Sequence, residues 1–151
     1  MSQQVIQLYA GDRPDGSPVL EEVVVEPVEA GRVRVLQSPG LVLGIAAGDV
    51  IEPLRDGKLN VISRGRNLNI QLFFRSEPVA LEREAKRRLG PLGGRMDGKA
   101  GKQLVFTVPV SAGFPAVEKE LRELTTDFPG VQWYYGNVYD PGDGVTPLNW
   151  W

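Results

Sequence analysis

The sequence predicts an α+β protein, in which a small N-terminal β-barrel or curved antiparallel sheet precedes a ferredoxin-like β-α-β-β-α-β half. Short strand-like runs rich in β-branched residues, separated by turn formers, follow one another through the first 65 residues. Helical periodicity appears only after Ser76, where it alternates with further strand-like runs. We therefore expect a β-rich lobe at 1–65, a ferredoxin-like lobe at 66–138 and a tail at 139–151 that ends in two Trp residues.

The strands expected in the N-terminal lobe cover residues 5–10, 20–28, 32–36, 50–54 and 59–64. Clusters of Gly, Pro and Asp separate most of them and supply the turns. In 20–28 and 32–36 apolar residues alternate with charged ones, which indicates one buried face and one solvated face. The side chains expected to point inward are Val23, Val25, Val33 and Val35.

A turn of small residues at 44–51, Gly-Ile-Ala-Ala-Gly-Asp-Val-Ile, leads into the fourth of these strands. Gly44 and Gly48 allow a positive φ or a close backbone approach there. Asp49 has two interpretations: a catalytic or cation-binding carboxylate, or a side chain that bonds backbone amides within the turn. We favour the second interpretation, because Asp49 directly follows Gly48 within the turn.

The second half contains the elements of a β-α-β-β-α-β unit in order. We expect strands at 67–74, 95–100, 103–110 and 131–135 and helices at 79–89 and 115–127. Ser76, Glu77 and Pro78 resemble a helix start, and the second helix carries an apolar stripe at 3-4 spacing. Residues 95–100 are only weakly strand-like and are expected at a sheet edge.

The tail combines turn-forming residues with two terminal Trp side chains. Trp150 and Trp151 either fold back onto their own domain or anchor a partner, because large aromatic side chains are costly to leave in water. Asp140 and Asp143 lack the run of oxygen ligands that a calcium loop requires. These four residues are the partner-binding candidates.

The composition excludes several kinds of chemistry. The 151 residues include no Cys and no His, so a thiolate nucleophile, a Ser-His-Asp triad and the usual zinc sites are impossible. No specific catalytic motif remains. We therefore nominate no catalytic residue and expect no cofactor and no metal site.

Nucleic acid and membrane are also not expected as partners. The net charge is −2, and the basic residues of 83–102 are interpreted as a solvated surface. The strand face that would stack bases offers only Phe73 beside Asn69, Gln71 and Thr107, which is too few aromatics for an RNA-binding sheet. No apolar run approaches the ~20 residues of a membrane span, and the first residues do not resemble a secretory signal. We expect a cytoplasmic protein.

Two segments, 31–36 with the following Pro39 and the turn at 44–51, resemble a family of small bacterial proteins of unknown function. Members of that family share a G-x-(Y/V)-R-V … P … G-I-A-x-G-D-V-I core, and the similarity extends over residues 22–138. Gly57-Lys58-Leu59 matches a Gly-x-(Leu/Tyr) strand of the family. Where members often carry a Ser-Gly-His-like stretch, this chain has Ser63-Arg64-Gly65-Arg66, so any role of that His is absent here. The resemblance implies no activity.

The leading hypothesis is a non-enzymatic protein-binding module, with another protein as its partner. Small acidic proteins include immunity and antitoxin proteins that neutralise bacterial toxins, and by this analogy the partner would be a toxin. The alternative is a module for a small anionic ligand or nucleotide, bound between the two halves. Its ligand-binding residues would be Arg64, Arg66, Arg75 and Asp49. The oligomeric state stays open.

Overall fold

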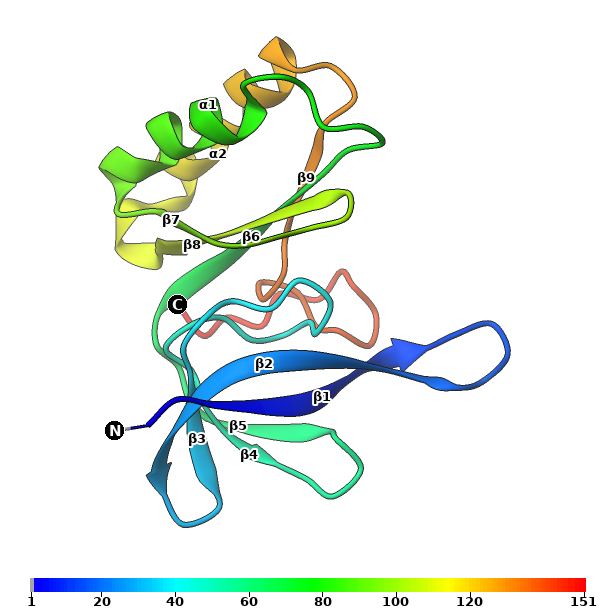
Figure 1. The fold of residues 1–151 in the computed structure, drawn as a ribbon. Helices are drawn as coiled ribbons and strands as arrows, with labels where there is room; N and C mark the ends of the chain where they lie inside the picture. The colour runs from blue at the N-terminus through cyan, green and yellow to red at the C-terminus, as the bar shows by residue number, and fades with distance from the viewer. Residues whose placement is uncertain (1) are drawn as a thin grey trace.

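A computed structural model describes residues 2–151, and in that range it contains two antiparallel sheets and two α-helices (Figure 1). The predicted α+β class is confirmed. The N-terminal sheet contains β1 (Gln4–Asp12), β2 (Pro18–Glu29), β3 (Arg32–Val35), β4 (Val50–Pro53) and β5 (Leu59–Ser63). The C-terminal half contains β6 (Asn67–Phe73), α1 (Leu81–Leu89), η1 (Gly90–Leu92), β7 (Arg95–Ala100), β8 (Gln103–Pro109), η2 (Val110–Ala112), α2 (Phe114–Asp127) and β9 (Gln132–Tyr135).

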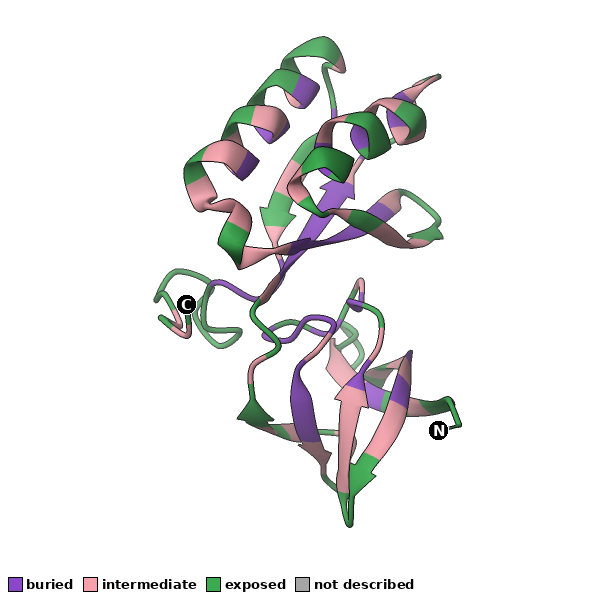
Figure 2. Cartoon of the chain, turned by 90° about the vertical axis from the view of Figure 1, so that its left-hand side faces the viewer, coloured by how far each residue is buried: buried purple, intermediate pink, exposed green. Residues whose placement is uncertain are grey.

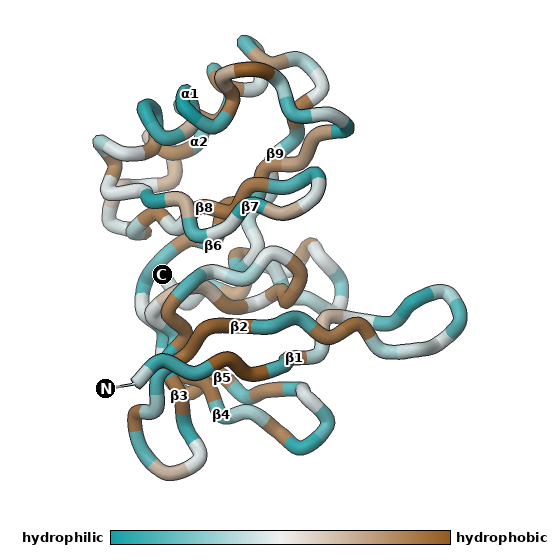
Figure 3. Tube along the Cα trace, viewed as in Figure 1, coloured by the Kyte–Doolittle hydropathy of each residue, from teal (hydrophilic) through white to brown (hydrophobic). Residues whose placement is uncertain are grey.

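The N-terminal sheet is an open meander of order β1-β2-β3-β4-β5, so the β-barrel expected as one alternative is wrong. A barrel requires its first and last strands to pair along their length. In residues 2–151, β1 and β5 are the two edges of the sheet and do not pair with each other. Besides its pairing with β2, β1 bonds the turn between β4 and β5, where the Tyr9 amide donates to the Gly57 carbonyl at 2.8 Å. The β1–β2 connection projects as a hydrophilic arm (Figure 3).

The core of this sheet forms where alternating apolar residues meet the loop between β3 and β4. Val23, Val25 and Val35 are buried as predicted, whereas Val33 is only half-buried. Val42 and Ile45 belong to that loop and pack into the same cluster. The loop is therefore a structural layer over the sheet.

The C-terminal sheet has the order β7-β8-β6-β9, with antiparallel pairing throughout. Both helices cover one face of it (Figure 1). The even-numbered apolar residues of β6 and β8 point toward the helices, since side chains alternate along a strand. They form a core with the helix stripes Leu81, Ala85, Leu89, Val117, Leu121 and Leu124.

The first helix begins two residues later than predicted. Ala80, which precedes it, has a left-handed conformation with φ 70°, and no side chain caps the helix. A left-handed residue cannot continue a right-handed helix, so Ser76 and Pro78 belong to the preceding loop.

The polar face of the C-terminal sheet is buried rather than solvated. Asn69, Gln71 and Thr107 are each at most 3% exposed. The Asn69 side chain donates to the carbonyls of Pro39 (2.8 Å) and Ile45 (3.2 Å), in the loop between β3 and β4. Figure 2 shows buried stretches of chain between the two halves, and much of this loop is buried. The loop thus joins the two sheets by covering one face of each.

Within residues 2–151, neither helix has the length and apolar character required to cross a membrane.

Candidate functional site

A groove of about 680 Å³ follows the edge of β9 and is the candidate site. Strand β9 forms one wall, the loop between β3 and β4 forms the second, and the tail forms the third. Residues 133–136 all line the groove, so both faces of the strand border it. The other lining residues are Gly40, Leu41, Leu43, Gln71, Phe73, Glu118, Tyr139, Asp140, Pro141 and Gly144.

Large apolar side chains reach water in this groove. Leu41, Leu43, Tyr134 and Tyr139 are 51%, 48%, 57% and 42% exposed. Tyr134 is held edge-to-face against Phe73, with ring centroids 5.3 Å apart. Exposed apolar residues scattered singly are ordinary, but a contiguous group marks an interaction surface.

The backbone of β9 is unpaired on its outer side. Antiparallel strands direct the N–H and C=O groups of alternate residues toward the partner strand and those between them away from it. The Gly136 amide donates to the Asn69 carbonyl at 2.6 Å, so Gly136 faces β6. By this alternation the backbone groups of Trp133 and Tyr135 point outward. Nothing else in residues 2–151 bonds them.

The charged groups of the groove are both acidic. Glu118 comes from α2, and Asp140 follows β9 in the tail. Glu118 accepts a hydrogen bond from the Tyr135 hydroxyl at 2.9 Å, and burial together with this carboxylate raises the pKa of Tyr135. No Lys or Arg of residues 2–151 lines the groove. The groove therefore favours a cationic occupant over an anionic one.

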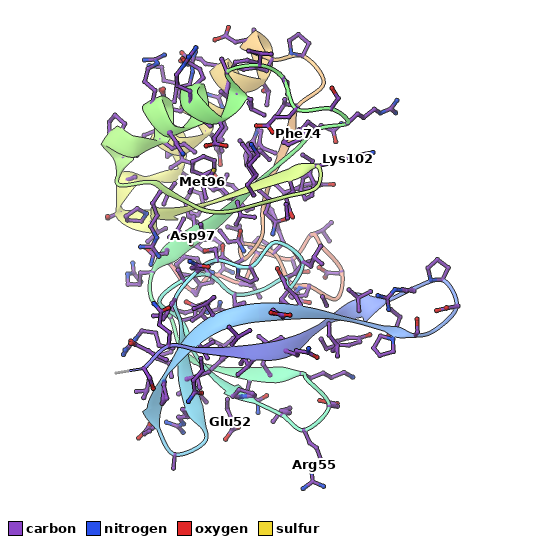
Figure 4. The ribbon with its side chains drawn as sticks, in the orientation of Figure 1. Glu52, Arg55, Phe74, Met96, Asp97 and Lys102 are labelled. Carbon is purple, nitrogen blue, oxygen red and sulfur yellow. The ribbon has the colours of Figure 1, made fainter. Side chains whose placement is uncertain are left out.

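Two carboxylates hold the loop wall of the groove. Glu21 in β2 accepts the backbone amides of Gly40 (2.8 Å), Leu41 (2.9 Å) and Val42 (2.8 Å). Asp97 in β7 lies on the side of the C-terminal sheet that faces the N-terminal lobe (Figure 4), where it accepts the Ser38 amide at 2.7 Å. One carboxylate from each sheet thus fixes the loop.

Asp49 and Arg64 lie together, outside the groove. The Asp49 side chain is 1% exposed and accepts the amides of Ala46 (3.0 Å) and Gly65 (2.9 Å). The Arg64 guanidinium approaches it at 3.2 Å and also donates to the Gly44 carbonyl at 2.6 Å. Burial raises the pKa of Asp49, while these hydrogen bonds and Arg64 act in the opposite direction. Asp49 holds the turn together.

The other two predicted arginines do not join this pair as a cluster. Arg66 directly precedes β6, and its guanidinium reaches the Trp150 carbonyl at 3.5 Å. Arg75 is exposed beyond the opposite end of β6, a strand that spans roughly 20 Å.

The terminal aromatic residues fold back onto the C-terminal half. Trp150 is half-buried and donates from Nε1 to the Asn137 carbonyl at 2.8 Å, and Arg64 lies 5.8 Å from its ring centroid. Trp151 packs on Phe114, with ring centroids 5.2 Å apart. Neither Trp lines the groove.

The two tail acids have different positions. Asp140 lines the groove, whereas Asp143 accepts the amides of Val145 and Thr146 at 2.9 Å each. The Thr146 hydroxyl and these amides lower the pKa of Asp143 to about 2. The sequence prediction missed the apolar side chains of the groove, although three consecutive aromatic residues at 133–135 were a visible signal.

A family model described as "Domain of unknown function (DUF4265)" matches residues 21–129. The chain belongs to this family. The matched region contains the loop wall of the groove and ends before β9.

A solved structure, the "Novel crystal structure of a hypothetical protein from Neisseria gonorrhoeae", resembles this chain with a TM-score of 0.66. The two proteins are 12% identical, and the match covers 90% of this chain and 95% of the other. At this identity the similarity establishes a shared fold alone. No curated protein matches this chain.

Proposed function

We propose that this protein is a non-enzymatic protein-binding module that holds a segment of a partner protein in the groove along β9. The observation that carries the proposal is the group of exposed side chains Leu41, Leu43, Tyr134 and Tyr139 beside an unpaired strand edge. Their burial by a partner would be favourable, and aromatic residues dominate the energetics of protein interfaces. The proposal therefore places partner binding at the residues that line the groove and not at Trp150 and Trp151. Of the candidates named from the sequence, Asp140 lines the groove and is kept.

A partner segment with basic side chains would suit this groove. Glu118 and Asp140 supply negative charge, and opposite charges across an interface favour encounter and correct orientation. Proteins that act on nucleic acids present basic surfaces, because phosphates dominate their binding. A toxin of that kind would match the groove, so the immunity or antitoxin role stays part of the proposal, with a cytoplasmic location.

The anionic-ligand alternative receives less support. Arg64 is already bonded to Asp49 and to the Gly44 carbonyl, and Arg75 lies far from it. The groove along β9 offers only acidic side chains as charged groups in residues 2–151. An anion would therefore find no cluster of free cations there.

We also propose that the C-terminal unit has the ferredoxin-like topology. Its strand order β7-β8-β6-β9, its antiparallel pairing and its two crossover helices on one face support this assignment.

Selection from a displayed library of linear peptides tests the binding proposal. Leu43→Asp places a charge in the groove, and Leu54→Asp makes the same change at an apolar residue of similar exposure (41%) elsewhere. We expect selected peptides to lose about tenfold or more in affinity, or roughly 1.4 kcal/mol, with Leu43→Asp and to bind Leu54→Asp as they bind the wild type. Equal binding to both variants would place the peptides outside the groove and overturn the proposal.

A further inference from the structure

We infer that the groove binds its partner by strand addition, in which an extended segment with alternating apolar and basic side chains pairs with the outer edge of β9. This inference rests on the proposed function and specifies its partner. A strand edge with neighbouring pockets recognises a peptide through main-chain hydrogen bonds for affinity and alternate side chains for specificity.

The outward backbone groups of β9 supply the pairing surface. Trp133 and Tyr135 are two residues apart, and each directs one N–H and one C=O away from β6. An added strand would satisfy all of these groups. Proteins commonly protect exposed edges with charges, Pro or a covering segment, because an open edge invites pairing with another chain. In β9 the sequence Gln-Trp-Tyr-Tyr carries no such protection.

The two faces of β9 then determine the side chains of the added strand. On the face toward the loop, Tyr134 lies with Leu41, Leu43 and Phe73. An added residue on this side meets an apolar surface. Gln71 is also buried on this face, and its amide nitrogen reaches the Pro39 carbonyl at 3.4 Å.

On the opposite face, the added strand meets a different environment. Trp133 and Tyr135 stand edge-to-face with centroids 5.0 Å apart, and Glu118 lies beside Tyr135. A guanidinium or ammonium group there would pair with a carboxylate and contact aromatic rings at the same time. Since side chains alternate along a strand, the preferred segment carries apolar residues at i and i+2 and a basic residue at i+1.

A second copy of this chain does not fit this description. Two β9 edges paired with each other would bring the acidic groups of both grooves together, and like charges across an interface are unfavourable. The chain's own alternating Val and Arg segment is β3, which is paired on both sides by β2 and β4. The occupant is therefore a segment of a different protein.

Synthetic peptides provide the test. The probe is a capped heptapeptide of alternating Val and Arg. One control peptide has Glu in place of each Arg. The second control has the composition of the probe, but all of its Val residues precede all of its Arg residues. We expect the alternating Val and Arg peptide to bind at least about tenfold more tightly than either. It should also slow amide exchange at Trp133 and Tyr135.

Backbone methylation separates strand pairing from side-chain binding alone. Two further probes carry N-methyl groups on the odd or on the even residues. A paired strand uses only alternate amides toward its neighbour, so one probe should bind like the parent and the other should lose binding. If both bind like the parent, strand addition is wrong, while the proposed function stands provided Leu43→Asp still weakens binding.

The charge requirement has its own matched pair of variants. Glu118→Gln keeps an acceptor for the Tyr135 hydroxyl but removes the charge, and Glu120→Gln makes the same change on α2 outside the groove. We expect Glu118→Gln, but not Glu120→Gln, to weaken binding of the Val and Arg peptide.

Library peptides that bind the groove while the alternating peptide does not would overturn this inference and leave the proposed function intact. A dimer of the free protein joined through β9 would overturn it as well.

Discussion

The backbones of Gly48 and Gly65 are in close contact, and a Cβ added to Gly65 would lie 2.4 Å from the carbonyl carbon of Gly48. Gly48 belongs to the turn that precedes β4, and Gly65 belongs to the connection from β5 to β6. The turn is therefore pressed against the link between the two sheets. The Asp49 carboxylate fastens the same contact by accepting the Gly65 amide.

Gly65→Ala should destabilise the protein by about 3 kcal/mol, the upper end for an overpacked site, because the clashing atoms are backbone and cannot rotate away. Gly90→Ala is the control, since Gly90 has a right-handed conformation and open space around its Cβ position. Urea denaturation monitored by circular dichroism measures both. Equal stability of the two variants would contradict the close approach.

Asp49→Ala should cost about 3–5 kcal/mol, because it removes the carboxylate that pairs with Arg64 and leaves two backbone amides without their partner. Asp49→Asn should cost less, since its amide oxygen can keep one of these hydrogen bonds. Urea denaturation near neutral pH provides the comparison. A loss below 1 kcal/mol for Asp49→Ala would mean that the turn is held by other contacts.

The stability difference between wild type and Asp49→Asn should depend on pH. Burial raises the folded-state pKa of Asp49 above its unfolded value of about 3.9. Its contribution to stability is therefore fully present below about pH 3.9 and is lost as the pH rises through the folded-state pKa. Wild type should lose stability relative to Asp49→Asn from about pH 4 upward. A relative gain would show that Arg64 and the hydrogen bonds outweigh burial.

Glu21→Gln should loosen the loop wall of the groove. The glutamine has one acceptor oxygen where the carboxylate uses two, so at least one of the amides of Gly40, Leu41 and Val42 loses its partner. We expect a loss of about 1.5–3 kcal/mol and faster hydrogen exchange at these amides. Glu22→Gln is the control, because Glu22 is exposed on the same strand. Unchanged exchange at 40–42 would contradict a role for Glu21 in holding the loop.

Trp150 and Trp151 should contribute unequally to stability. Trp150→Ala removes a half-buried ring and the hydrogen bond to the Asn137 carbonyl, for an expected loss of about 3 kcal/mol. Trp151 is more exposed, and Trp151→Ala should cost about 1 kcal/mol. Circular dichroism should be used to monitor denaturation, because removing a Trp changes the fluorescence signal itself. The reverse order of losses would indicate that Trp151 is the main anchor.

Local pattern was sufficient for the elements themselves. Alternation in β2 identified its core face, and the 3-4 spacing of Val117, Leu121 and Leu124 identified the core side of α2. These signals are local because the period of the chain determines which side chains share a face. The start of α1 was misplaced because the left-handed conformation of Ala80 has no such periodic signal.

The sequence by itself determined an α+β chain of antiparallel sheets and the order of its strands and helices. It also excluded reactions and metal sites that require His or Cys. Only the tertiary structure decided that the N-terminal sheet stays open, that Asn69 and Gln71 are buried, and that the groove forms. The burial of Asn69 and Gln71 and the groove depend on the loop between β3 and β4, which packs against residues distant in sequence and is held there by Glu21 and Asp97. Because hydrogen bonds between distant segments leave no periodic trace, no local pattern could place Leu41 and Leu43 beside Tyr134.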